Sequence, residues 1–557
     1  MADKAYHDYV FPIEEWPIYK LSNDRENFVN QLREETINRI LESEKKNLSE
    51  TLARVIYLER IRTIENPWKV DPPHELAFWN KLRKQLLENS LDKSEEEALE
   101  NNKEILTKIV NRYANEIPGR FKIGLFKKAR NSLTWFFNRL LSTASNRNLK
   151  RFYGPRRNLQ ERLKINGEVE LIQSLAKKGT LVVMPTHFSN LDSILVGWAL
   201  DSIGLPAFIY GAGLNLYNAS IVGYFFNRLG AYKLDRRKKN AIYLKTLKTF
   251  SDLAIQRGTH SLFFPGGTRE RSGSIEKKLK LGLMGTVTEA QRAHFERGEH
   301  DKIFVVPLVI CYNFVLEAPK LIDDFLKKEG EELYIMGKRE LSLWGLLKFV
   351  WQLFSSTSEI QISFGKPLDV MGNFVSKEGV SLDKNGSPID LKEYFLSNGK
   401  VTRDHQRDVQ YTKILGEIIV DRFHRENIVL SSHVVAFVAF NLFKARNPHL
   451  DLFGLVRLPK EDAIISYKSF WNAVDALKTL LLEYETSERL KLSTMVKGDI
   501  KNLLLDGIKN QGIYHSNKPL RFDADQNLVS DNMKLLFYYH NRLTGYDLES
   551  QIKWNDF

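Results

Sequence analysis

The sequence predicts a layered α/β domain flanked by N-terminal and C-terminal α-helical regions. Between about residues 155 and 372, short apolar runs bounded by Gly or Pro alternate with amphipathic stretches. Strands that alternate with helices are typical of a layered α/β fold. On both sides of this section, long runs carry apolar residues three and four positions apart, which is the helical period. The expected strands are Gly179 to Met184, Pro206 to Tyr210, Ala231 to Leu234, Ser261 to Phe264, Ile303 to Tyr312 and Ile360 to Phe364.

Changes of composition divide the 557 residues into four parts. The first is an N-terminal helical region, broken by Asn-Pro and Pro-Pro pairs between residues 66 and 73, and the second is the α/β domain. A stretch rich in Gly, Ser, Asn, Asp and Lys then predicts a linker loop before the C-terminal helical region. The expected boundaries are 1–150, 151–376, 377–402 and 403–557. The sequence has no internal repeat, which argues against solenoids and propellers.

Composition limits the class of protein and its setting. Apolar residues make up 43% and charged residues 27%, which excludes collagen-like and wholly disordered chains. The single cysteine, Cys311, cannot form an intramolecular disulfide, and residues 1–30 lack the order of a secretory signal. We therefore expect a reducing, cytoplasmic setting. Because the chain has no uninterrupted apolar run of about 18 residues, we expect any contact with a bilayer to be peripheral.

The charge balance favours anionic partners. The chain has 82 Lys and Arg against 69 Asp and Glu, a net charge of +13. Such a surplus suits nucleic acid, acidic lipid, a nucleotide-bearing cofactor or an acidic carrier protein, and it does not choose among them. The chain carries neither paired Cys/His zinc ligands nor an RNA-binding aromatic signature, which argues against a nucleic-acid partner.

The first chemical motif is His187 followed five positions later by Asp192, between an apolar strand and the helical run Ser193 to Leu200. The spacing alone is common, and Ser189-x-x-Asp192 equally matches a helix capping box. The carboxyl end of a strand is, however, where open α/β sheets place ligands. A turn there lets Asp192 reach Nδ1 of His187 and leaves Nε2 free as a general base, for example for an alcohol that attacks a thioester.

The second motif is the Gly-rich turn Pro265 to Gly273, which follows a predicted strand and bears Arg269 and Arg271 at alternate positions. Glycines permit the close approach of a phosphate, and guanidinium groups bind it in a bidentate manner. The turn is not a Walker loop, because no Gly-Lys-Ser/Thr ends it. An ordinary exposed turn with solvated arginines is the alternative interpretation.

Two further runs are individually weak. Gly230 to Arg236 equally fits an edge strand with a surface arginine, and Val305 to Tyr312 equally fits a buried strand. Taken in order, the four segments resemble the four blocks of the glycerolipid acyltransferase superfamily: H-x4-D, G-x-x-x-I-D/R-R, F-P-E-G-T-R-S-R-x-G and V-P-V-x-I-x-Y. Order, spacing and strand context agree across residues 187–312.

Other segments extend the resemblance to glycerol-3-phosphate acyltransferases of the larger, membrane-associated type. These are Ile360 to Pro367, Asn427 to Phe437 and Leu535 to Arg542. The resemblance implies an O-acyltransferase of phospholipid biosynthesis that moves a fatty acyl group to the sn-1 hydroxyl of glycerol 3-phosphate. It implies acyl-CoA or acyl-ACP (acyl carrier protein) as donor and neither a metal nor another cofactor.

The resemblance also assigns roles to individual residues. His187 would be the general base and Asp192 its orienting partner. The remaining assignments are Arg236, Arg269 and Arg271 for the acceptor's phosphate, Gly267 for close backbone approach, and Val306 and Pro307 for a wall of the acyl-donor site.

One departure concerns the third block, where the family's glutamate is Gly266 in this chain. Soluble plastid members carry a similar S-G-G-R-D-R turn without that glutamate, so Gly266 does not indicate an inactive enzyme. It leaves the identity of the acceptor open, and Glu270 is a candidate to supply a carboxylate from another direction. The alternative function is a lysophosphatidate (1-acylglycerol-3-phosphate) acyltransferase, or acylation of another lipid acceptor, with the same base. Intact His187 and Asp192 argue against a catalytically silent scaffold.

Two segments are candidates for contact with a membrane. Residues 120–157 hold eleven Lys or Arg and no Asp or Glu, with apolar residues spaced along one helix face. Such a basic amphipathic helix is attracted to an anionic bilayer, although the same face would equally pack against the α/β domain. The second candidate, Trp344 to Phe354, is apolar on nearly every side. We expect a peripheral protein at the cytoplasmic face of the membrane.

Overall fold

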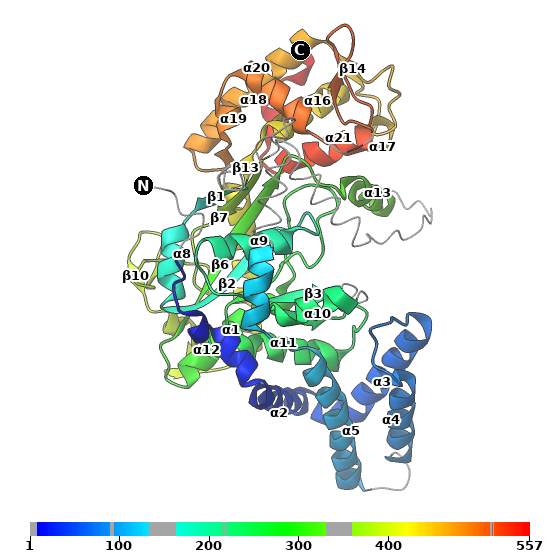
Figure 1. Ribbon diagram of the computed structural model, residues 1–557, viewed down its shortest axis with the longest axis vertical. Helices are drawn as coiled ribbons and strands as arrows, with labels where there is room; N and C mark the ends of the chain where they lie inside the picture. Colours follow the sequence, from blue (N-terminus) through cyan, green and yellow to red (C-terminus); the bar gives the residue numbers. More distant parts are fainter. Residues whose placement is uncertain are drawn as a thin grey trace.

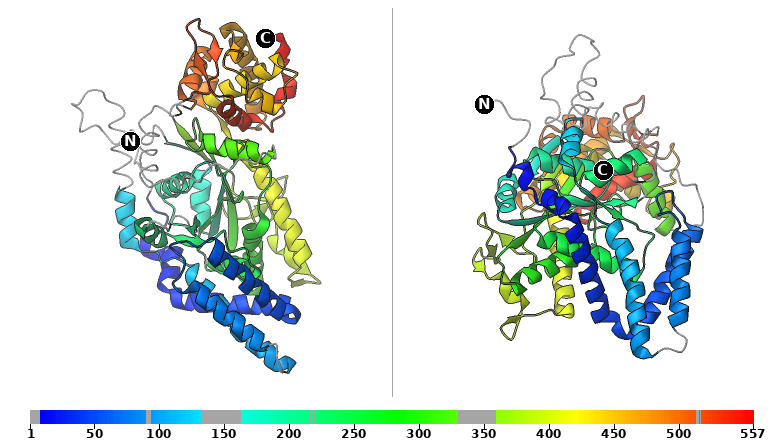
Figure 2. Two further views of the ribbon diagram at one scale, coloured as in Figure 1. Left: turned by 90° about the vertical axis from the view of Figure 1, so that its right-hand side faces the viewer. Right: turned by 60° about the horizontal axis from the view of Figure 1, so that its bottom comes forward.

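The computed structural model describes residues 8–89, 94–132, 163–214, 217, 220–329, 359–512, 515 and 517–557. The described chain is elongated, with N-terminal helices at one end, a mixed sheet and its helices in the middle, and C-terminal helices at the other end (Figures 1 and 2). The predicted fold class is confirmed.

The central sheet has seven strands in the order β1-β7-β6-β2-β5-β3-β4. The five strands from β6 to β4 run parallel, whereas β7 is antiparallel to β6 and parallel to β1. β2 and β6 are buried almost throughout, which explains their continuous apolar sequences. The strands are β1 (Leu163–Gly167), β2 (Gly179–Pro185), β3 (Ile209–Gly213), β4 (Ala231–Leu234), β5 (Ser261–Leu262), β6 (Lys302–Tyr312) and β7 (Ile360–Phe364).

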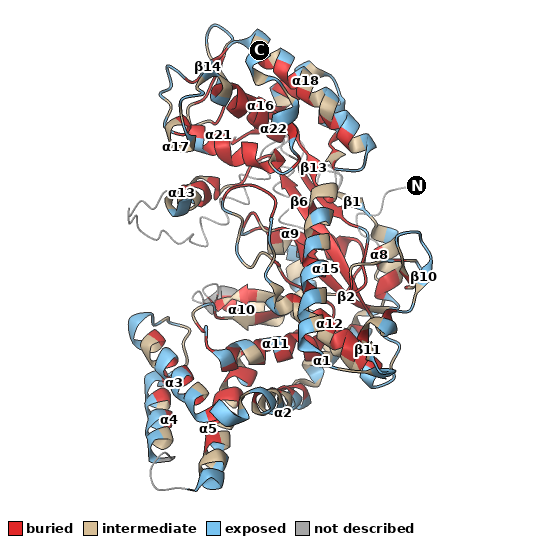
Figure 3. Cartoon of the chain, turned by 180° about the vertical axis from the view of Figure 1, so that it is seen from behind, coloured by how far each residue is buried: buried red, intermediate tan, exposed pale blue. Residues whose placement is uncertain are grey.

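Helices follow most of these strands. α11 packs against α12, and α12 in turn packs against α15, whose outer face is exposed (Figure 3). The helices of this part are α8 (Val169–Ala176), α9 (Asp192–Ser202), α10 (Ser220–Arg228), α11 (Ala241–Gln256), α12 (Leu281–Glu296), α13 (Ala318–Glu329) and α15 (His405–Glu426).

The N-terminal helices share a second core with the β3–β4 edge of the sheet and with α11. α2 and α5 pack directly on α11. A capping box between Ser94 and Glu97 explains where α5 begins. The helices are α1 (Pro17–Asn23), α2 (Arg25–Glu44), α3 (Leu48–Glu65), α4 (Glu75–Asn89) and α5 (Glu95–Glu116).

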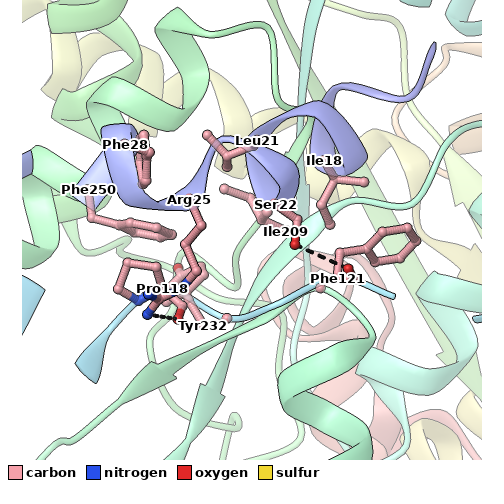
Figure 4. A pocket seen from close by; sticks show the side chains of 12 residues that line it. Ile18, Leu21, Ser22, Arg25, Phe28, Pro118, Phe121, Ile209, Tyr232 and Phe250 are labelled. Atoms are coloured by element: carbon pink, nitrogen blue, oxygen red, sulfur yellow. Dashed lines mark hydrogen bonds between the residues drawn. The ribbon is translucent and has the colours of Figure 1, made fainter. Parts of the chain in front are cut away.

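A small pocket lies where α1 and α2 meet the sheet edge (Figure 4). Ser22 Oγ donates to the carbonyl oxygen of Phe121 at 3.1 Å, and Arg25 Nη2 donates to that of Pro118 at 3.3 Å. The cavity volume is about 30 Å³, room for a few water molecules at most. This space belongs to the packing of the N-terminal helices and is too small for a substrate.

The C-terminal helices surround α16, whose residues 431–443 are all buried (Figure 3). α18, α20 and α21 pack around it, and its side chains are continuous with the core of the central sheet. The helices are α16 (Ser431–Arg446), α17 (Leu452–Leu455), α18 (Tyr467–Thr486), α19 (Thr494–Lys497), α20 (Ile500–Asn510), α21 (Met533–His540) and α22 (Leu548–Gln551). Short strands join them: β13 (Ile428–Val429), β14 (Ile464–Ile465), β15 (Lys491–Leu492), β16 (Arg521–Phe522) and β17 (Leu528–Val529).

The stretch expected as a linker loop, residues 377–402, contains short antiparallel strands. They are β9 (Ser381–Leu382), β10 (Pro388–Ile389), β11 (Leu396–Ser397) and β12 (Lys400–Val401), and β9 also pairs with β8 (Phe374–Val375), which lies just before this stretch. Strands of two residues are too short to produce an alternating pattern of apolar and polar residues. The polar, Gly-rich composition of this stretch therefore predicted a loop. The domain boundaries stay predictions.

Neither candidate membrane segment is fully described. Residues 123–132 of the basic stretch are helical, and the rest of that stretch from 133 onward lies outside the described residues, as does Trp344 to Phe354. Within the ranges given above, each helix is too short or too polar to cross a bilayer.

We predict that Arg39→Ala lowers the free energy of unfolding by about 3 to 5 kcal/mol, because it leaves a buried charge without its partner. Arg39 Nη2 lies 2.5 Å from Oδ2 of Asp252, whose side chain is 0% exposed. Denaturant unfolding measures the effect. Arg54→Ala, at an exposed position on α3, is the matched control. A loss no larger than that of the control contradicts the prediction.

Candidate active site

His187 and Asp192 lie in the connection between β2 and α9. β2 ends at Pro185, and Asp192 is the first residue of α9. The carboxyl end of a parallel strand, next to the N-terminus of a helix, is a position at which open α/β sheets bind ligands. The structure brings the two side chains together, with His187 Nδ1 2.8 Å from Asp192 Oδ2.

The carboxylate of Asp192 is fully buried and accepts several hydrogen bonds. Oδ2 also accepts from the backbone N–H groups of Phe188 at 2.7 Å and Ser189 at 2.8 Å. Oδ1 accepts from the hydroxyl of Tyr312 at 2.5 Å. Burial, and next the Asp192 carboxylate, raise the pKa of Tyr312 well above its ordinary value, so Tyr312 remains a donor. These donors stabilise a charge that burial alone would penalise.

The capping-box interpretation applies only in part. The N-cap residue of α9 is Leu191 rather than Ser189. Asp192 reaches back to the N–H of Ser189 and to His187 at the same time, so one carboxylate both orders the loop and orients the ring.

The imidazole of His187 is held in one orientation. Its ring stacks on Phe264 with centroids 4.1 Å apart and planes 26° apart. With Nδ1 donating to Asp192, Nε2 has no hydrogen-bond partner within the described part of the chain, and the side chain is 16% exposed. A neutral imidazole in this tautomer presents the lone pair of Nε2 and is able to accept a proton.

Two arginines with few carboxylate partners lie near this loop. Arg236 follows β4, and Arg269 lies in the turn after β5. Solvent reaches Arg236, yet the protein atoms around it and, to a smaller extent, the guanidinium of Arg269 lower its pKa. Arg269 Nη1 contacts Glu317 Oε1 at 3.2 Å. Two guanidinium groups that repel each other, of which only Arg269 contacts a carboxylate, favour an anion.

The Gly-rich turn lies against the histidine loop. The N–H of Glu270 donates to the carbonyl oxygen of His187 at 2.7 Å. Oε1 of Glu270 accepts from the hydroxyl of Ser272 at 2.8 Å and from the backbone N–H groups of Arg271 and Ser272, so it stabilises the turn. Arg271 is exposed, and no contact of its guanidinium is seen among the described residues.

Gly267 is required by its conformation, since its φ is +75°. A Cβ there would also lie 2.6 Å from Cδ of Lys280, whose side chain crosses the turn. Lys280 is thus a further cation beside the turn, which the sequence analysis missed because it lies outside the four blocks. Val306 and Pro307 are buried in the middle of β6, paired with Val183 and Met184 of β2. Their role toward an acyl donor stays a prediction.

Sequence reasoning also missed residues that tertiary structure brings to the loop. Glu317, just after β6, accepts from Ser189 Oγ at 3.1 Å and from the N–H of Asn190 at 2.9 Å. Glu276, in the segment between the turn and α12, accepts from the N–H of His187 at 2.8 Å. The sequence did offer one indication for Glu317, because this carboxylate closely follows the predicted buried strand Val305 to Tyr312.

The C-terminal segment packs on the same loops. The guanidinium of Arg542 lies over the ring of Phe188 at 4.2 Å and donates to the carbonyl oxygen of Ile310 at 3.0 Å. Asn541 Nδ2 donates to the carbonyl oxygen of Ser272 at 2.9 Å. Three of the four motif blocks are therefore in contact with the helices that follow the α/β domain.

Comparison with known proteins agrees with this geometry. Residues 166–311 match the protein family described as Acyltransferase. A glycerol-3-phosphate acyltransferase of Pseudomonas paraeruginosa is 27% identical over 261 residues, 47% of this chain and 27% of that protein. One of Pseudomonas fluorescens is 24% identical over 408 residues, 70% of this chain and 44% of that protein.

The chain spans less than half the length of these curated relatives. The matched family covers the strands and loops that carry the His187–Asp192 pair, the Gly-rich turn and most of β6. The chain therefore contains an acyltransferase domain of the glycerolipid type and is a distant homologue of bacterial glycerol-3-phosphate acyltransferases.

Proposed function

We propose that this acyltransferase joins a fatty acyl group from an acyl thioester to glycerol 3-phosphate, at the sn-1 hydroxyl, as a step of phospholipid biosynthesis. The observation that carries the proposal is the oriented imidazole of His187 in a loop that shares Glu317 with Arg269, whose guanidinium in turn acts on that of Arg236. A base and an anion-binding pair at the same edge of the sheet suit an acceptor with both a hydroxyl and a phosphate.

His187 Nε2 accepts the proton of the acceptor hydroxyl as its oxygen attacks the thioester carbonyl carbon. The C–O bond forms, and the tetrahedral intermediate collapses with cleavage of the C–S bond. The thiolate then takes the proton from His187, so the base is regenerated and no covalent enzyme intermediate forms. Asp192 keeps the ring in its tautomer and stabilises the imidazolium that exists between the two proton transfers.

The phosphate of the acceptor binds Arg236 and Arg269, with Arg271 and the close backbone at Gly267 completing the contact. Acyl-CoA or acyl-ACP brings the acyl chain, and Val306 and Pro307 belong to the wall of its site. No step requires a metal. The net charge of +13 supports attachment to an anionic membrane surface, where the amphiphilic product is released.

The acceptor is tested with purified protein and labelled acyl-CoA, offered glycerol 3-phosphate and lysophosphatidate in parallel. We expect faster transfer to glycerol 3-phosphate. A His187→Ala variant loses about 10²- to 10⁴-fold in kcat, because it lacks the base. Lys84→Ala, whose side chain is 81% exposed, is the control and retains activity. Transfer to lysophosphatidate alone supports the alternative acceptor, and a fully active His187→Ala variant removes this residue from the mechanism.

The phosphate site is tested with Arg236→Ala and Arg269→Ala. Each loses a charge-assisted hydrogen bond, so we expect the KM for glycerol 3-phosphate to rise about tenfold to a hundredfold. The KM for the acyl thioester stays unchanged. Glycerol serves as an acceptor without a phosphate, and with it both variants match the parent protein. An equal loss with the two acceptors contradicts the phosphate role.

A further inference from the structure

Glu276 is a buried carboxyl group that the proposed mechanism does not use. Its residue is 4% exposed. Oε1 accepts from the backbone N–H of His187 at 2.8 Å, and Oε2 is buried without a hydrogen-bond partner within the described ranges. The carbonyl oxygen of His187 is bound from the same segment by the N–H of Glu270 at 2.7 Å. Residues 270–276 therefore hold the peptide groups on both sides of the His187 Cα.

The side chain of Glu276 lies against Gly266. A Cβ built on Gly266 would be 3.3 Å from Cγ of Glu276 and 3.5 Å from its Oε1. The first distance is tighter than ordinary van der Waals contact, so a side chain at position 266 and the carboxyl group of Glu276 compete for one space. Gly266 does not have a positive φ, so its backbone does not demand glycine. A side chain at this position requires Glu276 to shift by a few tenths of an ångström.

We propose that Glu276 is a positioning residue for His187 and replaces the side chain absent at Gly266, so that the two positions act as one unit. This inference rests on the proposed function, because His187 is the group that Glu276 positions. Glu270 cannot fill the same place, since its carboxylate is engaged by Ser272 and the backbone of the turn.

Burial favours the neutral form of Glu276. Burial raises its pKa from the ordinary 4.5 to about 8, and the carboxylate of Glu270 contributes in the same direction. The N–H of His187 and the guanidinium of Arg542 lower the pKa by less. A neutral carboxyl group still accepts the His187 N–H through its carbonyl oxygen. An uncharged amide of the same shape performs the same task.

The first test compares Glu276→Gln with Glu276→Ala in the acyl-transfer assay. The glutamine keeps an acceptor for the His187 N–H, so its kcat stays within about threefold of the parent value. The alanine lowers kcat by about tenfold or more with little change in the KM for glycerol 3-phosphate, because the base loses its position. Glu100→Ala, 77% exposed, is the control.

Equal kcat for the alanine variant and the parent protein overturns the positioning role. A glutamine variant as impaired as the alanine variant shows that the negative charge matters, and overturns it as well. Absence of glycerol 3-phosphate acylation by the parent protein is a different result, because it refutes the proposed acceptor.

The second test asks whether positions 266 and 276 depend on each other. Gly266→Ala crowds Glu276 and lowers kcat in the parent chain. We expect it to have little effect when Glu276 is already Ala, since the competing side chain is gone. The double variant Gly266→Glu, Glu276→Ala has a kcat at least about threefold higher than that of Glu276→Ala alone. Such coupling is typical of residues in contact. If the two substitutions change kcat independently, so that their fold-effects multiply in the double variant, the pairing of positions 266 and 276 is overturned.

Thermal unfolding supplies a readout that needs no activity. The folded chain keeps the Glu276 proton up to about pH 8, whereas the unfolded chain loses it near 4.5. The contribution of this group to stability is thus present below 4.5 and is lost as the pH rises to about 8. Glutamine does not titrate, so Glu276→Gln lacks this loss of stability. The difference in Tm between the variant and the parent protein therefore shifts in favour of the variant as the pH increases from about 5 to about 8. A pH-independent difference contradicts a buried neutral acid at this position.

Discussion

The fully buried carboxylate of Asp192 is the constraint on which the rest of this site depends. Without donors, a charge in such a place would cost several kcal/mol, and the chain would neutralise or expose it. The loop after β2 adopts a conformation that turns two backbone N–H groups and the His187 imidazole onto one carboxylate oxygen, while the hydroxyl of Tyr312 in β6 donates to the other. The same contacts that make the buried charge tolerable also fix the tautomer and direction of His187.

The fold explains why these donors meet. β6 lies next to β2 in the sheet although more than 100 residues separate their ends, so Tyr312 and Glu317 reach the loop that carries His187. The helices outside the sheet contribute too. Arg542 packs on Phe188 from the C-terminal side, and Asp71, between α3 and α4, pairs with Arg237 at 2.5 Å. The C-terminal part therefore contacts the loop of His187 directly, whereas the N-terminal part binds Arg237, the residue next to Arg236.

The sequence predicted six of the seven strands of the sheet and placed His187 and Asp192 at a strand-to-helix junction, because apolar runs and local spacing carry that information. β1 lacked a continuous apolar run, and the two-residue strands between 374 and 401 were too short to leave a periodic pattern. Glu276 and Glu317 were missed for another reason. Their contacts with residues 187–190 depend on tertiary packing across 89 and 127 or more positions, which spacing in one sequence does not reveal. Glu270 was the candidate carboxylate because it lies close to Gly266 in the sequence, but in the structure its carboxylate accepts from the hydroxyl of Ser272 in its own turn.

The arrangement of carboxylates around the arginines says more about the ligand than the net charge of +13 does. Arg237 is neutralised by Asp71 and Asp235 and stacks on Trp68, so it has a structural task. Its neighbour Arg236 has no carboxylate partner among the described residues, and Arg269 shares Glu317 with the N–H of Asn190 and the hydroxyl of Ser189. Arg236 and Arg269 together thus have a single, partly engaged carboxylate partner. A phosphate would balance these two charges, whereas solvated arginines elsewhere on the surface need no such partner. The proposal of an anionic acceptor therefore rests on incomplete pairing at two positions rather than on the overall basic composition.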